Sequence, residues 1–215
     1  LIINPKLRSK YQKLSYKSFK LTHEYVSKLI DEVRDNSLVQ KQNIYIKKGF
    51  VKPRILHVTN FNERHNGRLF FNTGRRINNG FIRLGCSVLE FSDRDIQSNS
   101  KNYSDINGSK NLNQKLIKTC LNYKPDLIVL GHADLVSKNV LGSLKDDLPG
   151  LRIAQWFLDP LVKKGPDYEK NKRRIMDKMK YLDCSFLTTS PSALKFLDPN
   201  KNFFIPNPAD PSLEI

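Results

Sequence analysis

Short apolar runs alternate with helical stretches from residue 53 onward, and this alternation constrains the fold more than any other feature. The runs predict strands at 54–61, 87–91, 126–132, 151–157, 184–189 and 202–206. The stretches between them predict helices at 69–84, 112–123, 137–148, 167–181 and 192–197, and a polar loop at 93–110. Strands that are apolar on both faces and alternate with helices are typical of a parallel sheet covered on both sides.

Residues with special helix-end preferences support these boundaries. Gly85 follows the first helix, where a glycine commonly ends a helix, and Ser137 begins the third as its expected cap. Because crossovers between parallel strands are right-handed, the expected fold class is α/β, a Rossmann-like doubly wound parallel sheet.

The first 50 residues differ from the rest. They are rich in Lys and Ser, and apolar side chains fall at helical spacing over about residues 20–35. Lys47, Lys48, Gly49 and Pro53 then break the pattern. We therefore expect a basic helical extension over 1–50 that leads into a globular domain.

The charge balance invites a nucleic-acid interpretation. The chain has 215 residues and a formal net charge of +16, and residues 1–54 hold 13 basic and 4 acidic residues, a net +9. However, 25 of the 37 basic residues are Lys, and before residue 50 the only Arg residues are Arg8 and Arg34. Lys enrichment together with abundant Asn also follows from an AT-rich genome. Nucleic acid is therefore an unfavoured partner, and a weak contact between 1–50 and an anionic membrane is the alternative.

The cysteine and histidine contents argue against disulfide and metal sites. Cys86, Cys120 and Cys184 are widely spaced and odd in number, which favours packing roles in a reducing compartment. The four His residues and the acids do not reach metal-ligand spacing, so no metal site is expected. No aliphatic run approaches the length of a membrane span, so we expect a cytoplasmic protein.

Polar residues follow the predicted strands, at the edge where ligands bind in doubly wound sheets. The loop after the first strand combines amide, guanidinium and imidazole side chains ahead of a helix N-terminus, a combination that can hold a phosphate or a carboxylate. An ordinary solvated loop is the alternative interpretation. The candidate binding residues in this loop are Asn60, Arg64, His65, Asn66, Gly67 and Arg68.

Two further strand ends carry candidate catalytic groups. His132 and Asp134 follow the third strand, where His132 can act as a general base or bind a hydroxyl, or can be structural. Trp156 and Asp159 end the fourth strand, and an aromatic ring beside a carboxylate suits sugar recognition, although a core Trp and a turn Asp are an equal alternative. His57 lies within a strand and is expected to be a buried structural residue.

Several catalytic motifs are absent from the sequence. There is no G-x-G-x-x-G, no G-x-x-x-x-G-K-[ST] and no G-x-S-x-G. The dinucleotide fingerprint, the Walker A loop and the nucleophile elbow of α/β-hydrolases are therefore excluded as written.

Four segments in order resemble the N-terminal half of GT-B fold glycosyltransferases. They are 52–58 (KPRILHV), 124–129 (KPDLIV), 156–160 (WFLDP) and 204–210 (FIPNPAD). The last two resemble in particular the bacterial CgeB-like, family-4-like branch. The resemblance covers about residues 52–215, and residues 1–50 have no counterpart in it.

The resemblance implies a two-domain transferase that moves a sugar from a nucleotide-sugar to an acceptor hydroxyl without a metal or any other cofactor. It implies that 51–206 is the Rossmann-like, acceptor-side domain and that 207–215 begins an interdomain linker with Asn207 at the hinge. The loop 60–68 would face the donor phosphates and the acceptor, and His132 or Asp159 would be the acceptor-activating base. The C-terminal donor domain is missing, so a fragment that is inactive alone is expected.

Two alternatives remain open at this point. The first is a non-enzymatic binding module whose basic arm contacts nucleic acid or an anionic membrane, supported by Lys with interleaved Tyr and Phe. The second is a different doubly wound enzyme that acts on a small phosphorylated ligand.

Overall fold

The computed structural model describes residues 4–18, 28, 32 and 52–213. The chain divides into two units, Leu1–Val51 and Lys52–Ile215. In the first unit, helix α1 spans Pro5–Ser18. Of the helix expected at about 20–35, only residues 28 and 32 are described, and both are helical; the rest lies outside the described residues.

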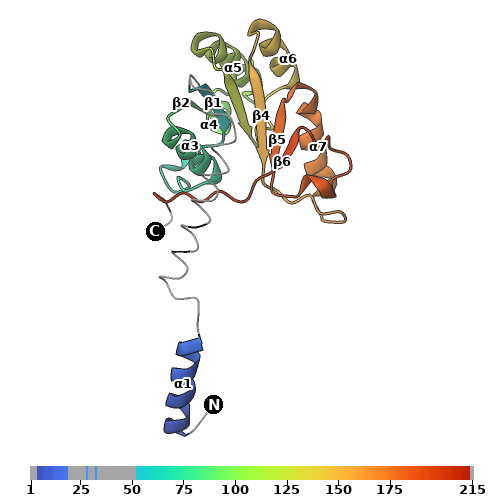
Figure 1. Cartoon of the computed structure of the whole chain (residues 1–215). Coiled ribbons are helices and arrows are strands. Elements are labelled where there is room, and N and C mark those ends of the chain that lie inside the picture. The colour runs from blue at the N-terminus through green and yellow to red at the C-terminus, as the bar shows by residue number, and fades with distance from the viewer. Residues whose placement is uncertain (1–3, 19–27, 29–31, 33–51, 214–215) are drawn as a thin grey trace. The chain divides into compact units, whose positions relative to one another are not determined.

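The second unit is built on one sheet of six parallel strands, in the order β2-β1-β3-β4-β5-β6 (Figure 1). The strands are β1 Arg54–Thr59, β2 Ser87–Ser92, β3 Leu127–Gly131, β4 Arg152–Phe157, β5 Cys184–Leu187 and β6 Asn202–Phe204. All six coincide with predicted strands within a few residues, and the predicted doubly wound α/β class is confirmed.

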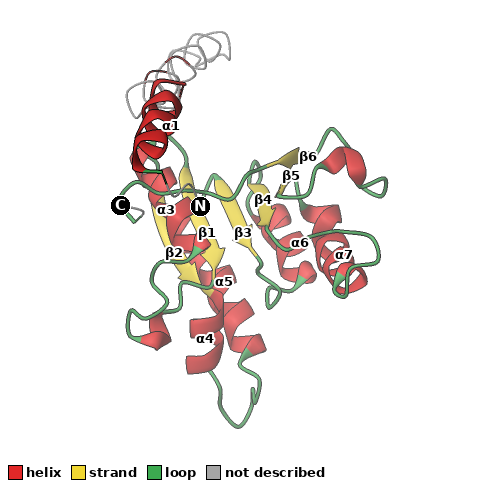
Figure 2. Ribbon diagram, turned by 90° about the horizontal axis from the view of Figure 1, so that it is seen from below, coloured by secondary structure: helices red, strands yellow, loops and turns green. Residues whose placement is uncertain are grey.

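Helices cover both faces of the sheet. Helix α3 (Thr73–Arg83) packs on one face, and α5 (Ser109–Tyr123), α6 (Lys138–Asp147) and α7 (Tyr168–Lys178) lie along the other (Figure 2). The chain leaves β1 in one direction to form β2, then returns past β1 to form β3. The sheet order therefore reverses between β1 and β3, and this reversal is where doubly wound sheets bind ligands.

The helix expected at 69–84 begins later, at Thr73. The Asn72 side chain accepts a hydrogen bond from the Arg75 N–H at 3.0 Å and caps the helix. Gly85 has a φ of +75°, so the predicted glycine end of this helix is confirmed. Ser137 likewise caps α6, because its hydroxyl accepts the Asn139 N–H at 3.3 Å.

The predicted loop at 93–110 is wrong over its first part, because Asp93–Asn99 forms helix α4. Asp93 and Asp95 lie in its first turn, where a negative charge stabilises a helix. Asp95 also accepts the Glu63 N–H at 2.8 Å and the Ser92 hydroxyl. These contacts hold α4 against a loop that lies more than 30 residues earlier in the chain. The composition of residues 93–110 alone does not predict such contacts.

Shorter 3-10 turns complete the unit at Glu63–His65, Met179–Tyr181 and Pro191–Ala193. The short helix expected at 192–197 is this last turn. Cys86, Cys120 and Cys184 are free thiols. Cys120 is buried in the core, and burial raises the pKa of its thiol to about 12, as expected of a packing residue.

After β6 the chain runs back to the α3 side of the sheet (Figure 1). Asp210 joins it to α3 by accepting hydrogen bonds from Arg83 Nη2 at 2.6 Å and Asn79 Nδ2 at 2.8 Å. The Arg83 hydrogen bond holds the pKa of Asp210 well below its usual range. The segment predicted to begin an interdomain linker is therefore fastened to α3.

Candidate functional site

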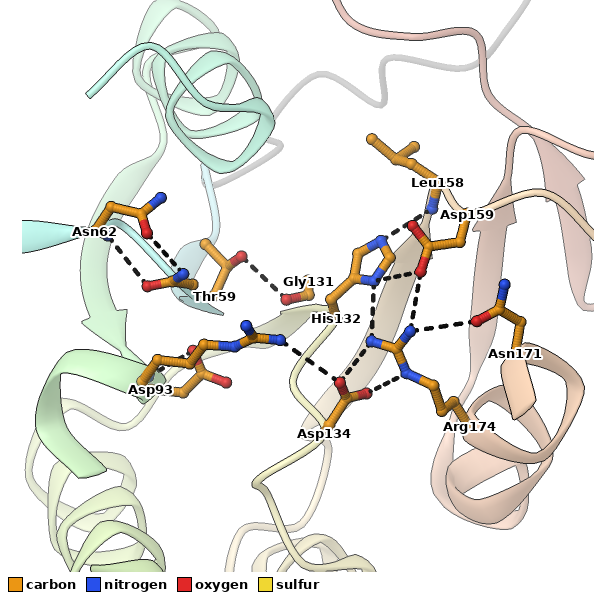
Figure 3. Close-up of polar contacts among 12 residues, drawn as sticks. Thr59, Asn62, Asp93, Gly131, His132, Asp134, Leu158, Asp159, Asn171 and Arg174 are labelled. Carbon is orange, nitrogen blue, oxygen red and sulfur yellow. Dashed lines mark hydrogen bonds and ion pairs between the residues drawn. The ribbon is translucent and has the colours of Figure 1, made fainter. Parts of the chain in front are cut away.

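A pocket of about 380 Å³ opens at the reversal point of the sheet. It is formed by the carboxyl ends of β1, β3 and β4, the N-terminus of α3, and side chains from α4 and α7 (Figure 3). The lining residues are Thr59, Asn60, Asn72, Thr73, Gly74, Arg94, Gly131, His132, Trp156, Asp159 and Arg174.

The floor of the pocket depends on Gly131, the last residue of β3. A Cβ at this position would lie 2.0 Å from Cζ2 of Trp156 and 2.7 Å from Oγ1 of Thr59. The Thr59 hydroxyl donates to the Gly131 carbonyl at 3.0 Å and ties β1 to β3 at this level. A glycine here therefore lets the indole ring cross the end of β3.

Trp156 belongs mainly to the core. Its side chain is buried, and its Nε1–H donates to Nε2 of His57 at 3.2 Å. His57 Nδ1 in turn lies 3.1 Å from Oδ1 of Asn78, so the neutral ring accepts on one side and donates on the other. The expectation of a buried structural His57 is confirmed. The indole can supply the pocket with a floor, but little of its face is open for stacking on a sugar ring.

Replacing His57 with Gln is expected to make folding stability less dependent on pH. Burial lowers the pKa of His57 from 6.5 to about 4, so its stabilising contribution is present above pH 6.5 and is lost as the pH falls towards 4. From pH 7 to pH 4 the unmodified protein should lose up to ~3 kcal/mol more of its unfolding free energy than His57→Gln.

Urea unfolding at pH 4, 5, 6 and 7 measures this difference. Burial raises the pKa of Asp93 to about 6, which acts with the opposite sign, but Asp93 is present in both proteins and cancels in the comparison. If the unfolding free energies of the two proteins fell equally as the pH is lowered, the buried and neutral state assigned to His57 would be contradicted.

His132 lies at the rim in the left-handed region, with φ +49°, a conformation that strains most side chains. Its Nε2 accepts the Leu158 N–H at 3.1 Å. Burial is the largest influence on its pKa and lowers it, which favours the neutral form of the ring. Nδ1 lies 3.3 Å from Nη2 of Arg174 and 3.6 Å from Oδ2 of Asp159, so the ring faces both members of that ion pair. Neither nitrogen of this neutral ring is then open to take a proton from a substrate.

Arg174 of α7 connects the acidic groups of the site (Figure 3). Its Nε and Nη2 bond both oxygens of Asp134, at 2.9 and 2.5 Å, and its Nη1 bonds Oδ2 of Asp159 at 2.9 Å. The guanidinium also stacks over Phe157, 5.1 Å from the ring centroid. The Asp134 hydrogen bonds raise the pKa of Arg174 and, together with the bond to Asp159, hold the guanidinium in place.

The opposite wall of the pocket favours an anion. Thr73 and Gly74 are the first residues of α3, where the helix leaves unpaired backbone N–H groups and a partial positive charge. Arg94 lines the same pocket, and its only ion pair among the described residues is a 3.8 Å contact with Asp134. A phosphate or carboxylate could be held here between the helix end and the guanidinium.

The structure brings together part of the predicted set. Asn60, His132, Trp156 and Asp159 line the pocket, and Asp134 joins them through its bonds to Arg174.

The rest of the first loop lies outside the pocket. Arg64 donates to the Arg94 carbonyl at 2.9 Å and pairs with Asp95 at 3.7 Å, so it fastens the loop to α4. His65 lies against Arg64, and Asn66, Gly67, Arg68 and the distant Asn207 are exposed. Their proposed contacts with a ligand stay predictions.

Sequence reasoning missed Arg174, Arg94 and the start of α3. Arg174 is one of several basic residues in its helix, and nothing local marks it as the one that faces Asp134 and Asp159. Asn72 did carry a signal, since Asn is a favoured N-cap residue, and it would have placed the α3 N-terminus at the rim.

The described residues contain neither a metal-ion cluster nor a helix that could span a membrane. Over residues 4–18, 28, 32 and 52–213, no three His, Cys, Asp or Glu side chains form a group that could hold a metal ion. In the same part of the chain, no helix combines the length and apolarity that crossing a bilayer requires.

Comparison with known proteins leaves the family open. Neither a protein-family model nor a curated protein sequence matches the chain. Among solved structures, it is similar to the glycosyltransferase SnogD from Streptomyces nogalater, at 16% identity and a TM-score of 0.37, over 71% of this chain and 50% of that one. It is also similar to a GH18 chitinase from Pseudoalteromonas aurantia, at 15% identity and a TM-score of 0.34, over 62% of each chain. The chain thus spans half the length of the glycosyltransferase, and TM-scores this low carry no argument about function.

Proposed function

We propose that the chain is the acceptor-side half of a GT-B glycosyltransferase, which transfers a sugar from a nucleotide-sugar to an acceptor hydroxyl. The observation that carries the proposal is the pocket at the β1/β3 reversal, which has a carboxylate on one wall and an anion-binding helix end on the other. The ordered sequence segments that resemble this family support it independently.

Each wall has a role in such a reaction. The α3 N-terminus and Arg94 would stabilise the diphosphate of the donor, where negative charge develops as the sugar leaves. Asp159 would take the proton of the acceptor hydroxyl. Its Oδ2 is held by Arg174, and its Oδ1 accepts no hydrogen bond within the described residues. His132 and Arg174 would orient this carboxylate, so of the two predicted bases we favour Asp159.

Sugar transfer by the protein expressed from its complete reading frame tests the proposal. The protein is incubated with UDP-, GDP- and ADP-linked sugars and a panel of hydroxyl acceptors. Release of the nucleoside diphosphate, together with a mass gain of one sugar unit on an acceptor, is the expected result. Folded protein that releases no nucleotide from any donor would count against a transferase.

A second candidate function, binding to an anionic membrane, is favoured by helix α1. The helix carries five basic residues and no acidic one. Leu7, Tyr11 and Leu14 follow at i, i+4 and i+7, and each is about half exposed. A basic helix with an apolar stripe suits a surface of anionic lipid.

Vesicle sedimentation distinguishes this second function. Binding to phosphatidylglycerol vesicles that weakens steeply with salt, and is absent from phosphatidylcholine vesicles, is expected if α1 binds membranes. Binding to DNA under the same conditions with none to vesicles would instead identify a nucleic-acid partner.

A further inference from the structure

A second pocket, of about 410 Å³, adjoins the first on the far side of Asp159. It lies between the chain segment that follows β4 and the start of α7. Its lining residues are Asp159, Pro160, Val162, Gly165, Pro166, Asp167, Tyr168, Lys170, Asn171 and Arg174. Only Asp159 and Arg174 are shared with the first pocket, so their ion pair separates the two.

The second pocket has an internally bonded wall. Asn171 is buried, its Nδ2 donates to the Pro160 carbonyl at 3.3 Å, and its Oδ1 accepts from Arg174 Nη1 at 3.3 Å. The same side chain therefore holds the segment after β4 and the guanidinium that holds Asp159. The wall and the carboxylate are positioned together before any ligand arrives.

The composition of the lining suits a neutral, hydroxylated ring. Tyr168 offers an aromatic surface beside the apolar Pro160 and Pro166, and these can contact the CH face of a sugar. Asp159 and Asp167 supply carboxylate oxygens that accept hydrogen bonds from hydroxyls. The lining holds two cations, Lys170 and Arg174, and the same two carboxylates, so it has no net charge. Arg174 is moreover already paired with Asp134 and Asp159.

We propose that the second pocket binds the acceptor and that the acceptor is a neutral carbohydrate, with one hydroxyl directed at Asp159. This inference rests on the proposed transferase function. In the transfer, the hydroxyl proton passes to Asp159 Oδ1 and the acceptor oxygen forms a bond to the anomeric carbon of the donor. The bond from that carbon to the diphosphate oxygen breaks, and the nucleoside diphosphate leaves with the electron pair.

Saturation-transfer NMR on the 215-residue chain tests the carbohydrate pocket. The probes are methyl glycosides of glucose, galactose, mannose and N-acetylglucosamine, together with maltose and cellobiose. We expect at least one of them to bind, about tenfold more weakly in Tyr168→Ala, and with near-normal affinity in Tyr168→Phe, which keeps the ring. Tyr103→Ala, at a fully exposed tyrosine outside both pockets, is the matched control and should bind normally.

A UDP titration of the same samples separates this inference from the proposed function. Trp156 is the single tryptophan of the chain and lines the first pocket, so its fluorescence reports binding there. Absence of sugar binding, or equal binding by Tyr168→Ala and Tyr103→Ala, overturns the carbohydrate pocket even when UDP binds. Tyr168-dependent sugar binding in the 215-residue chain, together with no nucleotide binding and no sugar transfer by the protein expressed from its complete reading frame, supports the pocket and overturns the transferase.

Discussion

Replacing Asp159 with Asn is expected to lower kcat for sugar transfer by about 10²–10⁴-fold while the protein stays folded. A positioned general base contributes a factor of this size, and an amide cannot take the hydroxyl proton. Asn keeps the size of the side chain and can still accept from Arg174 Nη1, which now bonds Oδ2 at 2.9 Å. Steady-state kinetics on the complete protein, with nucleotide release as the signal, measure the effect.

Asp177→Asn is the matched control for this experiment. Asp177 pairs with Lys138 on the surface of α6 and α7, at 3.1 Å and outside both pockets, and its loss should leave kcat unchanged. Near-normal turnover in Asp159→Asn, with turnover lost in His132→Ala, would reverse the roles argued here for the two residues. An equal loss in Asp159→Asn and Asp177→Asn would point to a general effect of charge.

Replacing Gly131 with Ala is expected to lower the unfolding free energy by about 1–3 kcal/mol, because overpacking a filled site forces neighbours to move. The added Cβ would lie 2.0 Å from an atom of the Trp156 ring, which is rigid and buried. The ring must shift, and its hydrogen bond to His57 must lengthen or break. Urea unfolding measures the loss, and Trp156 emission in the native state reports the displaced ring.

Gly80→Ala provides the comparison. Gly80 lies within α3, a Cβ there meets nothing within 4 Å, and Ala in a helix interior is favoured over Gly by about 1 kcal/mol. The two variants add the same methyl group, so they should move stability in opposite directions. Equal stabilities for Gly131→Ala and the unmodified protein would show that Trp156 does not need the space.

Local patterns accounted for most elements of the second unit. Residues 127–130 are four aliphatic side chains in a row, which is typical of a strand buried on both faces, and they form β3. The ends at Gly85 and Ser137 were predicted because their causes, a left-handed backbone and a side-chain cap, act within a few residues. Helix α4 was missed because part of its stabilisation, the hydrogen bonds that Asp95 accepts from the Glu63 and Arg64 N–H groups, comes from distant residues.

The candidate site was predictable in one respect. Ligand-binding residues follow the carboxyl ends of parallel strands, so His132, Asp134 and Asp159 could be named from their positions after strands. How these residues contact one another could not be predicted from the sequence. Arg174 joins Asp134 to Asp159 but lies 40 and 15 residues away from them in the chain, and its position depends on how α7 packs. The loop at 64–68 was chosen on its residue types and its place after β1; Arg64 bonds to α4 and residues 66–68 are exposed, and their contacts with a ligand stay predictions.

The sequence by itself determined the class of the second unit, because the alternation of doubly buried strands with helices admits few arrangements other than a parallel, two-sided sheet. Only the tertiary structure decided where its pocket lies. The order of the strands depends on pairing between segments far apart in the chain, as in Thr59 beside Gly131, and that pairing leaves no local periodic signal. This pairing of strands placed the reversal between β1 and β3. The first pocket therefore lies against the start of α3 with Trp156 as its floor, and the Asp159–Arg174 pair separates it from the second pocket.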